Sequence, residues 1–261
     1  MRLKERVAVI TGAASGIGKA IARRFASEGA LVIIADRNES AIPAAVEEIR
    51  GSGGKAAGHA VDVTEREQLA SFMEAIVARH GRLDILVNNA GITRYRPFLA
   101  ITGEDWDVVL DVDLKGVFFC SQAAAPHMVR QQYGRVVNIA SALGTGATPH
   151  GTAGSPGGSA AYAAAKAGVI MLTKTLAREL GPSGVTVNCV APGTFLTPIS
   201  GTTRSPEEVA EHLEHRKRTV VLGRIGTLEE LAASVLFFAS DDSSYVTGQT
   251  LFVDGGRFDR M

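Results

Sequence analysis

Two side chains that could transfer a proton stand four positions apart in the second half of the chain. Tyr162 and Lys166 are separated by three alanines, and residues four apart lie on one face of a helix. A free phenol has a pKa of about 10 and is a poor base at neutral pH, whereas a neighbouring ammonium favours the phenolate and lowers that pKa. Because this spacing also occurs on many solvated helices, the pair gains weight only with a cofactor site in the same domain.

A glycine-rich turn near the start of the chain predicts such a site. It follows the apolar run Val7–Ile10, which is typical of a buried parallel strand, and precedes a predicted helix over residues 19–27. A turn without a ligand is the plain alternative, and the glycine spacing differs from G-x-G-x-x-G. The flanking strand and helix nevertheless favour a pyrophosphate bound at the helix N-terminus. The predicted contacts are Gly12, Ser15, Gly16, Ile17 and Gly18.

The end of the second predicted strand indicates which dinucleotide is bound. Leu31–Ala35 leads into Asp36, and a carboxylate at this place can accept both ribose hydroxyls and would repel a 2′-phosphate. Arg37 follows and favours NADP instead, because arginine binds phosphate well. We expect NAD as the cofactor, since Asp36 holds the position that faces the ribose.

Composition limits the class of protein. The chain has 261 residues, with 27 basic and 27 acidic side chains, so nothing in its charge suggests a nucleic-acid partner. Cys120 and Cys189 stand among apolar residues and are expected to be reduced core thiols. The polar start and the absence of a long uncharged apolar stretch predict a cytoplasmic protein with no membrane partner.

Strand and helix patterns alternate from end to end, which predicts an α/β fold with a doubly wound (Rossmann) parallel sheet of about seven strands and helices on both faces. We expect a single domain over residues 1–261, a flexible loop at about 144–159 and a substrate-covering region at about 195–222 that includes a short helix, Glu207–Arg218. The predicted strands are Val7–Ile10, Leu31–Ala35, Ala56–Val61, Ile85–Asn88, Arg135–Ile139, Val185–Val190 and Thr250–Val253. Further predicted helices are Ile42–Arg50, Arg66–His80, Trp106–Gln131, Ala160–Leu180 and Leu228–Ser240.

At this point the chain resembles the short-chain dehydrogenase/reductase family in its single-domain form, over nearly its whole length. Several ordered motifs at compatible spacings are far more specific than any single one. They are the glycine turn Thr11–Gly18, Asn88-Asn89-Ala90-Gly91, Ser141, the Tyr162–Lys166 pair, Pro192-Gly193 with Thr197, and Val253-Asp254-Gly255-Gly256.

The resemblance implies a role for each matched residue. Tyr162 is expected to be the acid/base, Lys166 to lower its pKa and bind the nicotinamide ribose, and Ser141 to orient the substrate oxygen. The remaining implied cofactor contacts, on the adenosine and nicotinamide sides, are Asp62, Val63, Asn89, Ala90, Gly91, Pro192, Gly193, Phe195 and Thr197.

Two departures from the family pattern stand out. The fourth catalytic position, an asparagine in the family, is Asp113 here. A carboxylate at this place predicts a raised pKa for Lys166 and a weaker stabilisation of the Tyr162 phenolate; a purely structural role in a helix bend is the alternative. The gap between Ser141 and Tyr162 is also longer than usual, and its glycine/proline-rich segment is either a surface insertion or a flap over the substrate.

The resemblance implies hydride transfer between NAD(H) and a small-molecule secondary alcohol or ketone. The alternatives are a 3-oxoacyl thioester (acyl carrier protein) reductase using NADP(H), a catalytically silent dinucleotide sensor, and a nucleotide-sugar dehydratase or epimerase. We expect no metal, since His212 and His215 have no evident third ligand. Arg216–Arg218 is a surface turn or a site that attracts anionic substrates, and Trp106 is a packing anchor. Small residues along the first turns of 160–180 predict close helix pairing in a homotetramer.

Overall fold

A seven-stranded parallel sheet forms the centre of the computed structural model, which describes residues 1–146, 160–196 and 206–257. The strand order is β3-β2-β1-β4-β5-β6-β7, and every pair of neighbours is parallel. The predicted fold class and all seven predicted strands are confirmed. The strands are β1 Val7–Thr11, β2 Leu31–Asp36, β3 Lys55–Ala60, β4 Ile85–Asn88, β5 Gly134–Ile139, β6 Val185–Pro192 and β7 Thr250–Val253.

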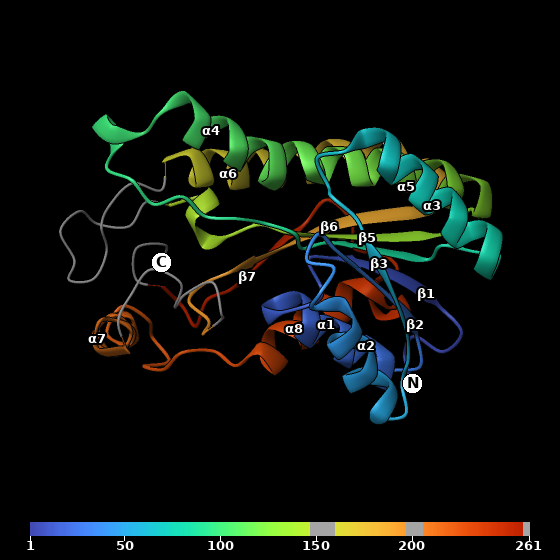
Figure 1. The fold of residues 1–261 in the computed structure, drawn as a ribbon, viewed down its shortest axis with the longest axis horizontal. Coiled ribbons are helices and arrows are strands. Elements are labelled where there is room, and N and C mark those ends of the chain that lie inside the picture. Colours follow the sequence, from blue (N-terminus) through green and yellow to red (C-terminus); the bar gives the residue numbers. More distant parts are fainter. Residues whose placement is uncertain (147–159, 197–205, 258–261) are drawn as a thin grey trace.

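Helices cover both faces of this sheet (Figure 1). The core under one face is built by α1, α2 and α8, and the core under the other by α3, α5 and α6. Strand β1 contributes side chains to both cores. Ala8 and Ile10 point to the first core and Val7 and Val9 to the second, because side chains alternate between the two faces along a strand. The helices are α1 Gly16–Ser27, α2 Ile42–Gly51, α3 Arg66–His80, α4 Gly103–Leu110, α5 Gly116–Gln131, α6 Ala160–Leu180, α7 Pro206–Lys217 and α8 Leu228–Ala239.

The helix predicted over Trp106–Gln131 is wrong in two respects. Helix α4 begins earlier, at Gly103, because Thr102 and Asp105 form a capping box in which the Thr102 hydroxyl accepts the Asp105 N–H at 3.0 Å. A π-turn, Asp111–Lys115, then separates α4 from α5. Trp106 remains 39% exposed on α4, so it is at most a partial packing anchor.

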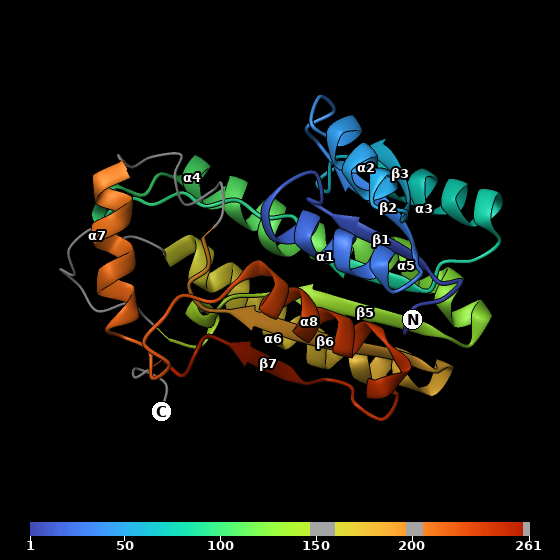
Figure 2. The ribbon, with the colours of Figure 1, turned by 90° about the horizontal axis from the view of Figure 1, so that it is seen from below.

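The carboxyl ends of the parallel strands meet at one edge of the sheet. The chain leaves β1 toward β2 and β3 on one side, and β4 to β7 follow on the other, so the topological switch point lies between β1 and β4. Ligands of open parallel sheets bind outside the carboxyl ends at such a point. Helix α7 stands on the side toward which β5 and β7 point (Figure 2).

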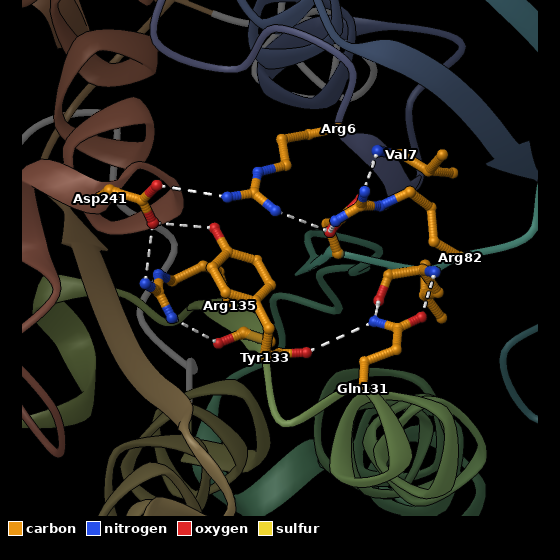
Figure 3. Close-up of polar contacts among 10 residues, drawn as sticks. Arg6, Val7, Arg82, Gln131, Tyr133, Arg135 and Asp241 are labelled. Atoms are coloured by element: carbon orange, nitrogen blue, oxygen red, sulfur yellow. Dashed lines mark hydrogen bonds and ion pairs between the residues drawn. The ribbon is translucent and has the colours of Figure 1, made fainter.

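A cluster of charged side chains closes the opposite edge of the sheet (Figure 3). Asp84, directly before β4, is fully buried and accepts the backbone N–H of Val7 at 2.8 Å. Arg6 bridges Asp84 and Asp241, with 3.2 Å to each carboxylate. Arg135 of β5 also binds Asp241, at 2.9 Å. These contacts tie the amino ends of β1, β4 and β5 to the turn after α8.

Three expectations concern residues outside the described part of the chain, wholly or in part. Most of the loop 144–159 lies there, as do Thr197 and residues 198–205 of the substrate-covering region. Within the described residues, no helix is long and apolar enough to cross a bilayer.

Candidate active site

The glycine turn forms one wall of the site, and its geometry explains its glycines. Gly12 and Gly16 have φ angles of 62° and 54°, in the left-handed region that favours glycine. A Cβ on Gly18 would lie 2.3 Å from the carbonyl oxygen of Gly12, so only glycine lets α1 start this close to β1. Ser15 is the N-cap of α1 and is exposed; its side chain makes no capping hydrogen bond within the described residues. The turn therefore presents a helix N-terminus and a hydroxyl to a pyrophosphate.

Asp36 is held in place beside this turn. Its Oδ2 accepts the N–H of Ala14 at 3.0 Å and its Oδ1 accepts the N–H of Asn38 at 2.9 Å. Each carboxylate oxygen keeps further acceptor capacity, which suits a pair of ribose hydroxyls. The neighbouring Arg37 is exposed.

Strands β1 and β4 are joined at the switch point by Thr11. Its hydroxyl accepts the N–H groups of Asn89 and Ala90, each at 3.0 Å. In return, the Asn89 side-chain amide donates to the carbonyls of Thr11 and Gly12 at 2.9 and 3.0 Å. The resemblance placed Asn89, Ala90 and Gly91 on the adenosine side, and these bonds hold that segment against the glycine turn.

The other predicted cofactor contacts also follow strand ends. Asp62 follows β3, and its Oδ1 accepts both the N–H and the hydroxyl of Thr64, at 2.9 and 2.8 Å. Gly193 follows β6, and a Cβ on it would lie 2.6 Å from the Cβ of Asp254. Phe195 is only 8% exposed and belongs to the core on the α1 face.

The side chains predicted to do the chemistry converge on the same edge. Tyr162 and Lys166 lie on α6, with the lysine Nζ 5.5 Å from the centroid of the tyrosine ring. Lys166 donates to the carbonyl of Ile139 at 3.1 Å and forms an ion pair with Asp113 at 3.0 Å. Ser141, two residues after Ile139, lies close enough to the Tyr162 phenol to lower its pKa. A general acid/base, a cation and a hydroxyl thus share one site.

Charges around the phenol act in opposite directions. Burial raises the pKa of Tyr162, and the charge of Asp113 and the neighbouring Tyr95 raise it further, while Lys166 and Ser141 lower it. The predicted lowering by Lys166 is present but outweighed, so the net pKa of Tyr162 lies above that of a free phenol. Burial disfavours the Lys166 ammonium, but Asp113 and Tyr162 together outweigh burial and raise the pKa of Lys166; a rise caused by Asp113 is what the sequence predicted.

The residue patterns missed two contributors to this geometry. The carbonyl of Ile139 orients Lys166, and a backbone acceptor leaves no mark in a sequence. Gly144 ends the short turn Ala142–Gly144, in which the Ser141 hydroxyl accepts the N–H of Leu143 at 3.2 Å. A Cβ on Gly144 would lie 2.9 Å from the backbone carbon of Lys166, so this glycine lets the turn pack on α6.

The sequence analysis also considered a metal site and a substrate-covering region. The described residues contain no cluster of three or more side chains able to hold a metal, and the side chain of His212 is outside the described part. Residues 220–222, after α7, are attached to the C-terminal signature: Val221 donates to the carbonyl of Gly256 at 2.8 Å and Leu222 to that of Gly255 at 3.1 Å. The covering region is therefore anchored beside the end of β7.

Comparison with known proteins agrees with this geometry. A family model described as "Enoyl-(Acyl carrier protein) reductase" matches residues 12–257. The 3-oxoacyl-[acyl-carrier-protein] reductase FabG of Thermotoga maritima is 46% identical, over 98% of this chain and 99% of the relative. The (2S)-[(R)-hydroxy(phenyl)methyl]succinyl-CoA dehydrogenase subunit BbsD of Thauera aromatica is 42% identical, over 98% of each chain.

The solved structures give the same result. The crystal structure of a short-chain type dehydrogenase/reductase from Mycobacterium marinum superposes with a TM-score of 0.88 at 36% identity, covering 97% of this chain and 95% of that one. The chain is an oxidoreductase that belongs to the short-chain dehydrogenase/reductase family.

Proposed function

We propose that this enzyme transfers a hydride between NAD(H) and a ketone/secondary-alcohol pair, and that the ketone is the 3-oxo group of an acyl thioester. The observation that carries the reaction type is the convergence of the Tyr162 phenol, the Lys166 ammonium and the Ser141 hydroxyl at the carboxyl edge. A silent dinucleotide sensor would have no need of this arrangement.

The names of the relatives support the thioester. One is named for a 3-oxoacyl group on an acyl carrier protein and another for a hydroxylated acyl group on coenzyme A. Among the readings of the sequence, they favour the alternative over an unspecified alcohol dehydrogenase.

Each catalytic side chain then has a defined task. The nicotinamide, when bound, supplies the hydride to the carbonyl carbon in reduction or accepts it in oxidation. Tyr162 gives its phenolic proton to the carbonyl oxygen as the alcohol forms, and takes the proton back in the reverse direction. Ser141 donates a hydrogen bond to the same oxygen, which orients it and stabilises developing negative charge. Lys166 stabilises the phenolate that remains and offers an N–H to the nicotinamide ribose.

Asp36 supports NAD rather than NADP. Its two oxygens are fixed by the N–H groups of Ala14 and Asn38, so the carboxylate cannot turn away easily from a 2′-phosphate. An unneutralised negative charge beside that phosphate would cost several kcal/mol. Arg37, which is exposed, would have to turn toward the phosphate to offset this cost.

A comparison of substrate classes, each with both cofactors, tests the proposal. Reduction of acetoacetyl-CoA is followed at 340 nm with NADH and with NADPH, and oxidation of sugars, steroids and cyclic alcohols with NAD and with NADP. We expect the thioester with NADH to give the highest kcat/KM, and Asp36→Asn to narrow the preference for NADH about tenfold or more. Equal or better efficiency with NADPH would overturn the cofactor assignment, and faster turnover of a free alcohol would overturn the substrate class.

The predicted homotetramer is proposed with a revised basis. Ala161 and Ala165 of α6 are buried in a cluster with Val109 of α4 in the same chain, so they do not serve a contact between copies. Ala164, Ala167 and Met171 are exposed on α6 instead, the methionine by 60%, and offer a small-residue face. Light scattering at micromolar concentration tests the assembly, and a monomer would contradict it.

A further inference from the structure

A carboxylate is buried between the exit of β4 and the catalytic lysine. Asp113 lies in the π-turn Asp111–Lys115 and is fully buried. Its Oδ2 accepts the N–H of Ile92 at 2.9 Å, and its Oδ1 lies 3.0 Å from Nζ of Lys166, whose side chain is 4% exposed. Three segments far apart in the sequence therefore meet at one side chain.

Both neighbours of Asp113 are hydrogen-bond donors, and this decides which side chain fits. A carboxylate accepts on both oxygens, so it can bind the Ile92 N–H and the lysine ammonium together. An asparagine has one acceptor oxygen and would point its NH₂ group at one of the two donors. The site is therefore built for an acid, although the family to which the chain belongs has asparagine here.

The surrounding backbone is adapted to the same contact. A Cβ on Gly91 would lie 2.8 Å from Oδ1 of Asp113 and 3.5 Å from Nζ of Lys166. Any larger residue at position 91 would press on the ion pair. A buried ion pair holds its geometry, because separating the two charges leaves each uncompensated.

We propose that Asp113 is a positioning residue: its carboxylate keeps Lys166 as an ammonium and ties it to the backbone of Ile92, in a bridge that an amide at this position cannot make. Lys166 has three N–H bonds. The carbonyl of Ile139 accepts one at 3.1 Å, and Asp113 holds the ammonium as an ion pair at 3.0 Å. The inference rests on the proposed function, and it places the ammonium between these two oxygens.

The bridge also sets the pH at which Tyr162 works. Tyr162 faces Lys166 and Ser141, which lower its pKa, and Asp113 and Tyr95, which raise it. Lys166 faces Asp113 from the π-turn, Tyr162 on its own helix, and Cys189 of β6, whose thiol has a pKa of about 11 and is neutral at working pH. Asp113 is the carboxylate in this set, so its negative charge opposes the phenolate directly.

The test compares Asp113→Asn with Asp111→Asn. Asp111 is a matched control because it lies in the same π-turn but forms an exposed ion pair with Lys115, at 3.0 Å. In alcohol oxidation kcat/KM rises with pH as Tyr162 becomes the phenolate. We expect Asp113→Asn to move this rise to lower pH by about one unit and Asp111→Asn to leave it unchanged. Superimposed profiles of Asp113→Asn and the unmodified enzyme would overturn the proposal.

A second readout needs no substrate, so it separates this inference from the proposed function. The phenolate of Tyr162 is titrated by its ultraviolet absorbance, as the difference between each protein and its Tyr162→Phe counterpart. Asp113→Asn should lower the midpoint by a similar amount, even if every substrate tried proves wrong; an unchanged midpoint would refute the charge effect.

A double variant covers the case in which Asp113→Asn folds poorly. Asp113→Asn/Lys166→Met removes both charges of the pair, so it should melt at a higher temperature than Asp113→Asn alone. If the double variant melts no higher than the single variant, the two side chains are not coupled and the proposal fails.

Discussion

Asp84→Asn should destabilise the protein strongly without touching its chemistry. Asp84 is fully buried at the edge of the sheet opposite the active site. Four hydrogen bonds end on its carboxylate: the Val7 N–H at 2.8 Å, Arg6 at 3.2 Å, and Arg82 through two nitrogens at 2.7 and 2.6 Å. An asparagine keeps the shape but loses the charge and one acceptor oxygen, so several of these donors lose their partner.

The expected size of the effect follows from the exposure of the partners. Breaking a buried ion pair costs roughly 3–5 kcal/mol. The side chains of Arg6 and Arg82 are 23% and 42% exposed, so water can recover part of that loss. We expect the free energy of unfolding to fall by about 2–4 kcal/mol, which for a chain of this size lowers Tm by roughly 5–15 °C.

Asp242→Asn is the matched control. Asp242 is the neighbour of Asp241 in sequence and pairs with Arg2 at 3.3 Å, but both side chains are 51% exposed. Such a pair contributes about 0–1 kcal/mol, so Tm should change by no more than about 3 °C. Calorimetry or circular dichroism measures both variants, and kcat at 20 °C should stay within about twofold of the unmodified enzyme in each. The reasoning fails if the two variants have the same Tm, or if the folded Asp84→Asn variant has lost turnover.

Three further predictions concern the site and the core. Tyr162→Phe should lower kcat by about 10²–10⁴-fold while NADH binding, followed by fluorescence, stays nearly unchanged, because only the acid/base group is lost; retained activity within tenfold would assign the proton to another group. Gly18→Ala should weaken NADH binding at least about tenfold, since its Cβ would lie 2.3 Å from a carbonyl oxygen of the turn, whereas Gly51→Ala, with nothing within 4 Å of the new Cβ, should bind normally; equal binding by both would contradict the geometry. Burial raises the pKa of Cys120 to about 12 and that of Cys189 to about 11, from an ordinary 9.0. Their contribution to stability is therefore complete below about pH 9 and is lost as the pH rises toward these values; iodoacetamide at pH 8 should label both thiols only after unfolding, and labelling of the native protein, read by mass spectrometry, would show that the thiols are accessible.

Local patterns in the sequence were sufficient for the strands, for most of the helices and for the choice of candidate site residues. Buried parallel strands are continuous apolar runs, so all seven could be read from the chain. The glycine turn, Asp36 and the Tyr162–Lys166 pair were also readable, because each depends on neighbours a few positions away. How the helices and strands pack against one another could not be predicted from such local patterns.

The helix predicted over Trp106–Gln131 shows the limit. The capping box of Thr102 and Asp105 stands in the sequence ahead of the apolar pattern that the prediction used. The π-turn has no local signature, and in it Asp113 reaches Ile92 and Lys166, which are distant in sequence. The net direction of the Tyr162 pKa was missed for a related reason: burial and the charge of Asp113 outweigh the lysine, and burial is a property of the folded chain.

The sequence by itself determined the reaction class of this protein, because hydride and proton transfer need particular residue types at short, fixed spacings. The tertiary structure decided how those residues are tuned. The carbonyl of Ile139 and the carboxylate of Asp113 fix the direction of the lysine, and the cluster around Asp84 holds the far edge of the sheet. Both depend on distances between segments brought together by the parallel sheet, and electrostatic interactions in a buried site depend on distance and burial far more than on order along the chain.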